Sequence, residues 1–206
     1  MTSKQYVAVI ADVVASRDLP RPSRTRLQDA LRAELTRINR RAAWRPFLAA
    51  RFAVTAGDEI EGLLTSAAPL WTITHSLRAA MPDVHWIVGC GRGPIATALA
   101  PTAPEIDGPC FHAAREALDA AKRDRRVLAF GGFDDPRLDG WAAYYSALYW
   151  GWTARQRKAA ARWRAPETPT AHERIVPSAY SHLRSRMAWP LVEEGDRIFQ
   201  AALEQA

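Results

Sequence analysis

The sequence predicts an α+β protein in which a ferredoxin-like sheet is followed by a separate all-α region. Apolar runs typical of strands alternate with helical patterns as far as Pro136, and beyond that residue only helical patterns remain. With 206 residues, 48% of them hydrophobic and 24% charged, the chain is long enough for one or two globular domains. We therefore expect two domains, residues 1–136 and residues 137–206.

The first half of the predicted sheet consists of a buried strand, a helix and a hairpin. Residues 5–14 are apolar and β-branched without alternation, which is typical of a central strand buried on both faces. Residues 24–43 place leucine and isoleucine at spacings of three and four, which predicts a helix with arginines on its opposite face. Residues 51–55 and 60–64 predict two short strands joined by a tight acidic turn that contains Gly57.

The second half of the sheet continues the alternation of strands and helices. Residues 70–80 predict a helix, 85–91 a strand, 111–123 a helix and 127–130 a last strand. The resulting order, β-α-β-β-α-β-α-β with a hairpin between crossover units, is the pattern of a ferredoxin-like sheet. The C-terminal region is expected to contain helices at residues 141–150, 153–163, 170–175, 178–189 and 190–202.

Two features place the chain among proteins of the cytoplasm with no membrane partner. The longest apolar run, residues 6–15, is about half of the roughly 20 residues of a membrane helix and contains Asp12. No basic segment and cleavage site typical of a signal peptide surround it. Cys90 and Cys110 lack the C-x-x-C spacing of metal or redox sites, so buried free thiols are expected, with a disulfide as the alternative.

Positive charge is concentrated in two segments of the chain. The net charge is +6, yet residues 21–51 hold nine arginines against two acidic residues and residues 153–189 hold eight basic residues against two acidic ones. The rest of the chain is therefore acidic. A basic segment favours an anionic partner such as a nucleic acid, and the alternative is an ordinary solvated helix face.

Three acidic residues are candidates for a metal site. Asp12 closes the first predicted strand, and Asp58 and Glu59 lie in the hairpin turn. In a sheet of this order the two points fall on neighbouring central strands, where their carboxylates would repel one another unless a cation neutralised them. Hard oxygen ligands suit Mg²⁺ or Mn²⁺, which also hold nucleotide phosphates. The alternative is that Asp12 only caps the loop that follows it.

The same residues carry a resemblance to known families. Ala11-Asp12-Val13-Val14-Ala15-Ser16-Arg17 resembles the first metal motif of class III nucleotidyl cyclases, and Ala56-Gly57-Asp58-Glu59-Ile60 resembles the signature turn of the diguanylate cyclase (GGDEF) palm domain. The chain resembles the SatD family of bacterial proteins over nearly its full length, and the cyclases over residues 5–130.

The resemblance implies a palm-like site with assigned roles. Asp12 and Asp58 would be the metal ligands, and Glu59 a catalytic base or auxiliary ligand. The loop that begins at Val13 would cradle a phosphate, with Ser16 and Arg17 as donors. Such a site would support binding of a nucleotide or phosphoester, or an in-line nucleotidyl transfer.

The sequence departs from the cyclase pattern in the segment that would neutralise the transition state. His112 stands in place of an Asn, and Arg115 lies one position early, which is about 100° of helix rotation. The first glycine of the GGDEF-type turn is replaced by Ala56. Arg115 is expected either to contact the phosphate or to be a surface charge, and His112 to be a half-buried core residue.

The C-terminal region resembles a helix-turn-helix domain, by its basic excess and by similarity to sigma-like and SatD C-terminal domains. In that plan the second helix meets base edges while arginines contact phosphates. The expected DNA-binding residues are Ser181, His182, Arg184, Ser185 and Arg186, with Ala179, Leu183 and Met187 turned inward. The alternative is a helical bundle that packs on the sheet or forms a homodimer, with tryptophans in its core or interface.

These observations together predict a regulatory protein that couples a metal- and nucleotide-binding domain to a DNA-binding one. One alternative is an active metal-dependent nucleotidyltransferase or cyclase whose C-terminal helices serve dimerisation. A third is a DNA-binding adaptor whose palm-like domain is inactive.

Overall fold

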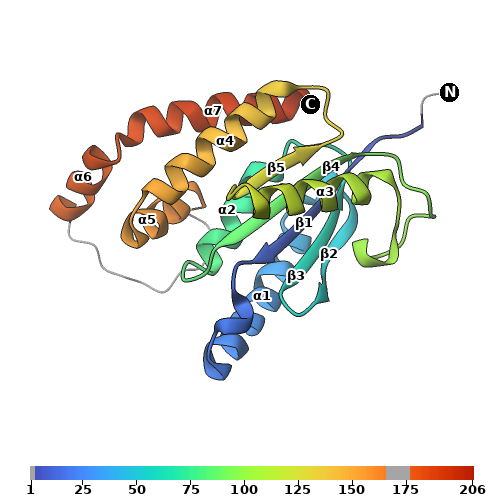
Figure 1. Cartoon of the computed structure of the whole chain (residues 1–206), viewed down its shortest axis with the longest axis horizontal. Coiled ribbons are helices and arrows are strands. Elements are labelled where there is room, and N and C mark those ends of the chain that lie inside the picture. The colour runs from blue at the N-terminus through green and yellow to red at the C-terminus, as the bar shows by residue number, and fades with distance from the viewer. Residues whose placement is uncertain (1–2, 166–176) are drawn as a thin grey trace.

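A five-stranded mixed sheet forms the centre of the computed structural model, which describes residues 3–165 and 177–206 (Figure 1). The strand order is β2-β3-β1-β4-β5. Every neighbouring pair is antiparallel except β4 and β5, which are parallel. The strands are β1 (Tyr6–Val13), β2 (Leu48–Ala56), β3 (Glu59–Leu64), β4 (Trp86–Gly93) and β5 (Leu128–Gly131).

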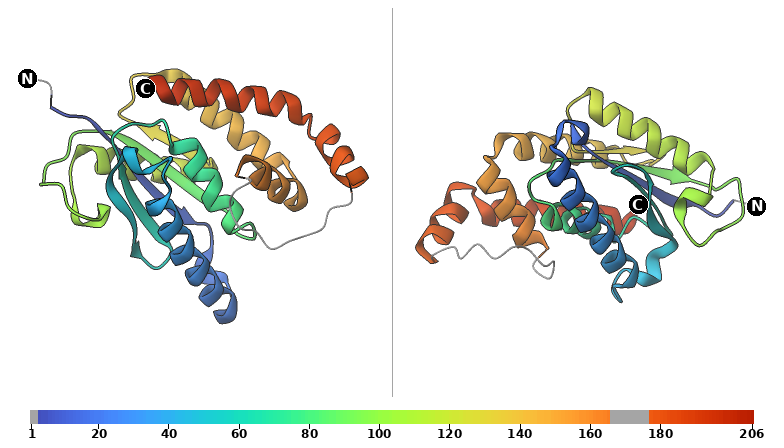
Figure 2. Two further views of the ribbon diagram at one scale, coloured as in Figure 1. Left: turned by 180° about the vertical axis from the view of Figure 1, so that it is seen from behind. Right: turned by 90° about the horizontal axis from the view of Figure 1, so that it is seen from below.

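Helices cover both faces of this sheet (Figure 2). Side chains of α1, α2, α4 and α7 pack with Val7 and Val9 of β1 on one face, whereas α3 packs with Ala8 and Ile10 on the other. The helices are α1 (Arg21–Arg40), α2 (Leu70–Ala80), α3 (Pro109–Arg123), α4 (Pro136–Gly151), α5 (Ala154–Arg164), α6 (Pro177–Arg186) and α7 (Trp189–Gln205).

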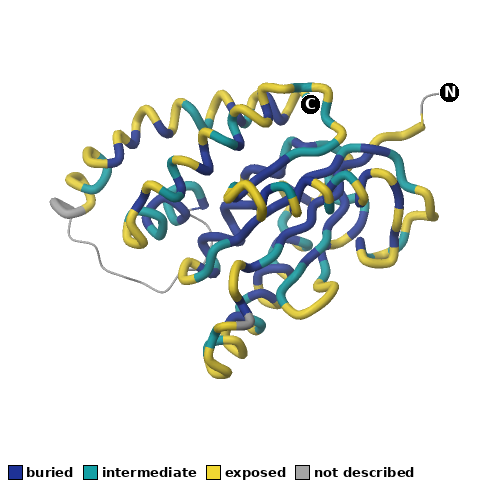
Figure 3. Tube along the Cα trace, viewed as in Figure 1, coloured by how far each residue is buried: buried dark blue, intermediate teal, exposed yellow. Residues whose placement is uncertain are grey.

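The predicted α+β class and the ferredoxin-like order of elements are confirmed. β1 lies between β3 and β4 and is buried on both faces, as the absence of alternation in its sequence indicates (Figure 3). The hairpin of β2 and β3 follows α1, and α3 connects the parallel pair β4 and β5. This arrangement places the end of β1 beside the β2–β3 turn.

Element ends differ from the predicted ones by a few residues. The first helix begins at Arg21, directly after Pro20, and ends at Arg40. β4 continues through Gly91 to Gly93. The predicted end of this strand at Gly91 is wrong because glycine in a strand also marks a close approach of another backbone, which is the case here.

Helix α3 lies directly on β4 because two strand residues have no side chain. A Cβ atom at Gly91 would clash with the carbonyl oxygen of Cys110 and the backbone nitrogen of Ala114, and one at Gly89 would clash with the carbonyl oxygen of Ala114. This contact fixes the height of α3 above the sheet. The same contact therefore fixes the positions of the charged α3 side chains that point toward the ends of the strands.

The helices after residue 136 share a core with the sheet. Tyr145 of α4 and Phe199 of α7 belong to the same buried cluster as Val9 and Val88 of the strands. The last strand ends before Pro136, as expected, and the division into two domains at that point stays a prediction. The expected helix at 170–175 lies outside the described residues, and the expected helices at 178–189 and 190–202 correspond to α6 and α7.

Cys90 and Cys110 are free, buried thiols, as predicted. They belong to the cores on opposite faces of the sheet, which separates their sulfur atoms. Burial raises the pKa of both thiols, that of Cys110 to about 11, so neither is a reactive thiolate near neutral pH. In the part of the chain that is described, no helix has the length and apolar character needed to cross a membrane.

Gly91→Ala is expected to lower the free energy of unfolding by about 1–3 kcal/mol, because the new Cβ collides with the backbone of α3. Gly140→Ala in α4 is the matched control, since a Cβ there meets nothing within 4 Å and alanine favours the helix by about 0.5–1 kcal/mol. Urea unfolding of both variants measures the two changes. Equal stability of the two variants would contradict the close packing of α3.

Candidate functional site

The end of β1 and the β2–β3 turn bring Asp12 and Asp58 together. β1 and β3 pair antiparallel with Ala11 opposite Ile60, so the residues that follow on β1 reach the turn. The backbone N–H of Val13 donates a hydrogen bond to Oδ2 of Asp58 at 3.3 Å. Gly57 adopts a left-handed conformation, φ +64°, which allows the tight turn. The predicted convergence of these two acidic residues is present in the structure.

The Asp58 carboxylate is in an unfavourable electrostatic environment. Burial raises its pKa, and the negative charge of Asp12 raises it further. Hydrogen bonds from the Ser16 hydroxyl and the Val13 N–H act in the opposite direction without cancelling the burial effect. A cation placed between the two carboxylates would relieve both the desolvation and the repulsion.

Lys122 of α3 already supplies one cation at this position. Its Nζ atom lies 2.6 Å from Oδ2 of Asp12. Lys122 is not among the site residues that the sequence predicts. Its spacing from Arg115 could have indicated it. Lys122 follows Arg115 by seven residues, which is two helical turns, and therefore lies on the same face of α3.

Arg115 forms a second ion pair on the same face of the helix. Its guanidinium donates to both Glu59 oxygens, at 2.5 and 2.7 Å, and to Oε1 of Glu61 at 3.3 Å. The Arg115 hydrogen bond lowers the pKa of Glu59, with a smaller contribution from Thr55. An ionised, paired Glu59 is a weak general base. Arg115 is engaged with carboxylates and is therefore not a plain surface charge, and its expected contact with a phosphate stays a prediction.

The residues predicted to form a phosphate cradle lie at the end of β1 and in the loop that follows it. Ser16 is 8% exposed, and its hydroxyl donates a hydrogen bond to the Asp58 carboxylate. The backbone N–H of Val13 donates to the same carboxylate. Both donors therefore hold the carboxylate in place. Arg17 lies in the short 3₁₀ turn Ser16–Asp18, and its side chain is outside the described part of the structure.

His112 differs from its predicted place in the core. Its side chain is 67% exposed, and its Nε2 atom lies 3.1 Å from Oδ1 of Asp107. The prediction is wrong because the buried face of α3 is formed by other residues, among them Phe111 and Ala114, and His112 points away from the sheet.

The donor set at Asp12 and Asp58 fits a divalent ion only in part. Among residues 3–165 and 177–206, no three His, Cys, Asp or Glu side chains form a group that could hold a metal ion. Mg²⁺ is often bound by one or two carboxylates, while waters and substrate phosphates complete its coordination. The two aspartates therefore suit an ion that arrives with a phosphate better than a permanently bound metal.

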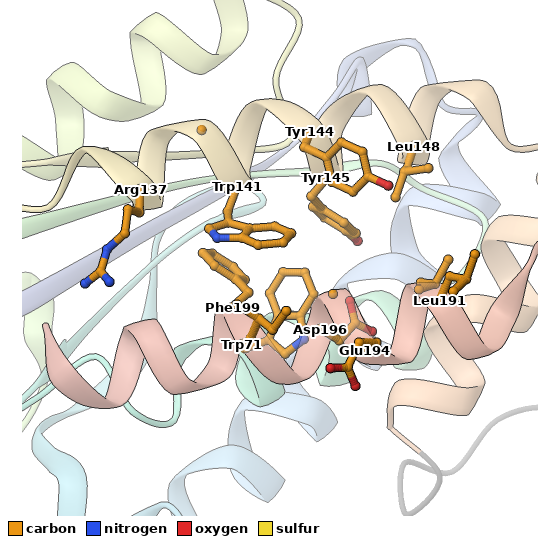
Figure 4. Close-up of a pocket in the computed structure, with 14 residues that line it drawn as sticks. Trp71, Arg137, Trp141, Tyr144, Tyr145, Leu148, Leu191, Glu194, Asp196 and Phe199 are labelled. Carbon is orange, nitrogen blue, oxygen red and sulfur yellow. The ribbon is translucent and has the colours of Figure 1, made fainter.

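A cavity lies away from these residues, between α4 and α7 (Figure 4). Its volume is about 590 Å³, and Trp71, Trp141, Tyr145 and Phe199 supply aromatic walls. Asp196 at its edge forms an ion pair with Arg164. The sequence does not predict this cavity, because it forms between helices that are far apart in the sequence.

The residues expected to bind DNA all lie on α6, but they differ in how far their side chains are exposed. Ser181, His182, Ser185 and Arg186 are exposed, while Leu183 and Met187 turn inward as expected. Arg184, expected among the exposed contacts, is only partly exposed, and its side chain packs against neighbouring residues of the protein. It donates to Glu193 at 3.0 Å and its guanidinium lies over the rings of Trp163, Tyr180 and Trp189.

The topology defines the class of this protein as α+β with a ferredoxin-like sheet, and comparisons with known proteins give the family. The SatD family matches residues 6–126, more than half of the chain, and the chain belongs to this family. No curated protein matches it. One solved structure that is similar is described as the structure of a bacterial light-regulated adenylyl cyclase. The two share 13% sequence identity with a TM-score of 0.47, over 63% of this chain and 77% of the other.

Asp58→Asn is expected to change how stability depends on pH. Because the pKa of Asp58 is raised in the folded state, the folded protein binds its proton more tightly than the unfolded chain, and the stability contributed by protonation is lost as pH rises through the folded pKa. The variant lacks this loss. Its stability relative to the unmodified protein should therefore increase from acid toward neutral pH and then level off.

Urea unfolding at several pH values measures this difference. Asp29→Asn is the control, since Asp29 is an exposed α1 residue paired with Arg32. A difference that decreases between acid and neutral pH for Asp58→Asn would show that the carboxylate is stabilised, and not strained, in the folded protein.

Proposed function

We propose that this SatD-family protein binds Mg²⁺ or Mn²⁺ between Asp12 and Asp58 and, through the ion, a nucleotide or other phosphoester. The observation that carries the proposal is the pairing of two carboxylates at the ends of adjacent strands, where burial and mutual repulsion raise the pKa of Asp58. A bound divalent ion would neutralise these carboxylates and attract phosphate oxygens.

The residues around the aspartates have separate roles in this proposal. Ser16 and the Val13 N–H orient the Asp58 carboxylate. Lys122 neutralises Asp12 in the absence of an ion and is free to contact a phosphate once the ion replaces it. The Glu59–Arg115 pair fixes the hairpin turn to α3. Together these residues would form a site for a charged ligand. Binding of a nucleotide at this site would act as a regulatory signal.

Turnover is the second candidate function, as a metal-dependent nucleotidyltransferase or cyclase. The cations of α3 favour it, because Arg115 and Lys122 flank the carboxylates and would stabilise charge on a transferring phosphate. The exposed Tyr144 and Leu191 on α4 and α7 favour the dimerisation that this alternative assigns to the C-terminal helices. Binding without turnover is preferred because Glu59, the expected base, has a lowered pKa and is held by Arg115.

The proposed regulatory function also includes DNA binding by α6. Four exposed polar or basic side chains of α6 and the basic excess of residues 153–189 support it. Arg186 is the expected phosphate contact, and Arg184 has a structural role through Trp163 and Glu193. The coupling of a nucleotide signal to DNA would pass through α4 and α7, which pack on the sheet.

Thermal unfolding with a panel of nucleotides, each with and without Mn²⁺, tests the metal site. A ligand at 100 times its Kd raises the free energy of unfolding by about 2.7 kcal/mol, and each kcal/mol raises Tm by about 2–4 °C in a protein of this size. Asp12→Asn and Asp58→Asn should abolish the joint shift, while Asp29→Asn should retain it. An unchanged shift in both site variants would refute the proposed site.

The same samples separate binding from turnover. Conversion of ATP or GTP in the presence of Mn²⁺, lost in Asp58→Ala, would establish the enzyme. A thermal shift without conversion would establish binding alone.

Binding to duplex DNA is expected to weaken steeply with salt, with a slope of about −0.9 in log K against log[salt] for each phosphate neutralised. Arg186→Gln should reduce this slope by about 1. Arg123→Gln on α3 is the matched control, because this arginine is also exposed but distant in sequence. Fluorescence anisotropy gives the affinities, and equal slopes for the two variants would exclude α6 as the DNA contact.

A further inference from the structure

A second charged cluster lies in the interior, on the face of the sheet opposite α3. His75 and Arg78 of α2, Arg157 and Arg164 of α5, and Tyr149 of α4 surround a small cavity of about 10 Å³. Other side chains that line it are Pro82, Val84, Tyr145, Trp152, Ala160 and Ala161. No Asp or Glu of the described residues lines this cavity. Its only ionised groups are therefore cations.

Arg78 is a buried cation with donors to spare. The residue is 3% exposed, and its Nη2 atom donates to the carbonyl oxygens of Trp86 and Val127, at 3.0 Å each. Its Nε and Nη1 atoms are buried without a hydrogen-bond partner among the described residues. The guanidinium also lies over the rings of Tyr145 and Tyr149, which offset part of its desolvation. The Tyr149 hydroxyl lies close enough to interact with this guanidinium, but neither Nε nor Nη1 makes a hydrogen bond of ordinary geometry to a described residue.

His75, one helical turn before Arg78, adds a further donor. It is 1% exposed, and neither ring nitrogen has a hydrogen-bond partner within the described residues. Burial, with the nearby charges of Arg164 and Arg78, holds its pKa well below the usual value. The ring is therefore neutral and carries one N–H group. Orphaned donors of this kind are rare in folded proteins unless a water or ion satisfies them.

The charges around the cavity do not balance. Arg164 forms an ion pair with Asp196, at 2.5 and 2.8 Å, and Asp196 lies at the edge of the larger cavity shown in Figure 4. Arg157 donates to the carbonyl oxygens of Trp152 and Tyr149, which carry no net charge. Arg157 is partly exposed to solvent, whereas Arg78 is a buried guanidinium without a carboxylate partner among the described residues. A buried charge without a counterion is strongly unfavourable.

We propose that this cavity binds one monovalent anion of halide size, with chloride as the natural ligand, through Arg78 and the N–H of His75. The cavity is close to the size of one water molecule; a halide ion is somewhat larger than that, whereas phosphate, sulfate and carboxylates are much too large. A water molecule would satisfy the donors but leave the positive charge unbalanced. The anion would link α2 to α5 and thereby tie the C-terminal helices to the face of the sheet.

Thermal unfolding of the full chain at constant ionic strength tests the proposal. Sodium chloride and sodium bromide should raise Tm with saturation, whereas sodium gluconate, whose anion is too large for the cavity, should not. The concentration for half of the effect should increase at least tenfold in His75→Phe and in Arg78→Gln. Arg123→Gln, an exposed arginine of α3, should respond as the unmodified protein does. Equal Tm in chloride and gluconate would overturn the proposal, as would a halide response that both cavity variants retain.

Crystals of the unmodified protein grown in bromide give a readout that needs no variant to fold. An anomalous scattering peak within hydrogen-bond distance of Arg78 Nη1 and a His75 ring nitrogen is the expected result. A cavity that contains only water in bromide would refute the anion site. Because no residue of this cavity belongs to the Asp12–Asp58 site, either proposal can fail while the other stands.

Discussion

The pairing of β1 with both β3 and β4 is the interaction on which the rest of the structure depends. Side chains at odd positions of β1, such as Val7 and Val9, enter the core under α1, α2, α4 and α7, while those at even positions enter the core under α3. Because alternate residues of a strand face opposite sides, a shift of one position would exchange the two sets and place Asp12 in the wrong layer. The same register that builds both cores therefore brings Asp12 to the β2–β3 turn.

Close packing of α3 on β4 converts this register into a site. The missing side chain at Gly91 lets the helix backbone approach the strand, and the helix then holds Arg115 and Lys122 over the carboxylates at the strand ends. A helix held rigidly in this way fixes its charged side chains with less loss of entropy than a loop would require. The charge balance of the candidate site thus rests on an apolar contact made by residues with no charge at all.

The two faces of the sheet carry local excesses of opposite charge. On the α3 face, carboxylates are in excess at the end of β1, and burial disfavours the charge of Asp58. On the other face, guanidinium groups are in excess, and Arg78 lies among aromatic rings without a carboxylate. Each excess favours a small ion of the opposite sign. The two proposed sites would therefore let solution ions alter the stability of this protein at two chemically distinct places.

The sequence by itself determined the class of fold, the double burial of β1 and the acidic pair, because apolar periodicity and turn residues are local signals. It also indicated free thiols at Cys90 and Cys110. Only the tertiary structure decided which cations meet the acidic residues, that Arg115 binds Glu59, and that His75 and Arg78 share a cavity with arginines from α5. The physical reason is that ion pairing and burial depend on which distant segments become neighbours, and a one-dimensional pattern does not contain those distances.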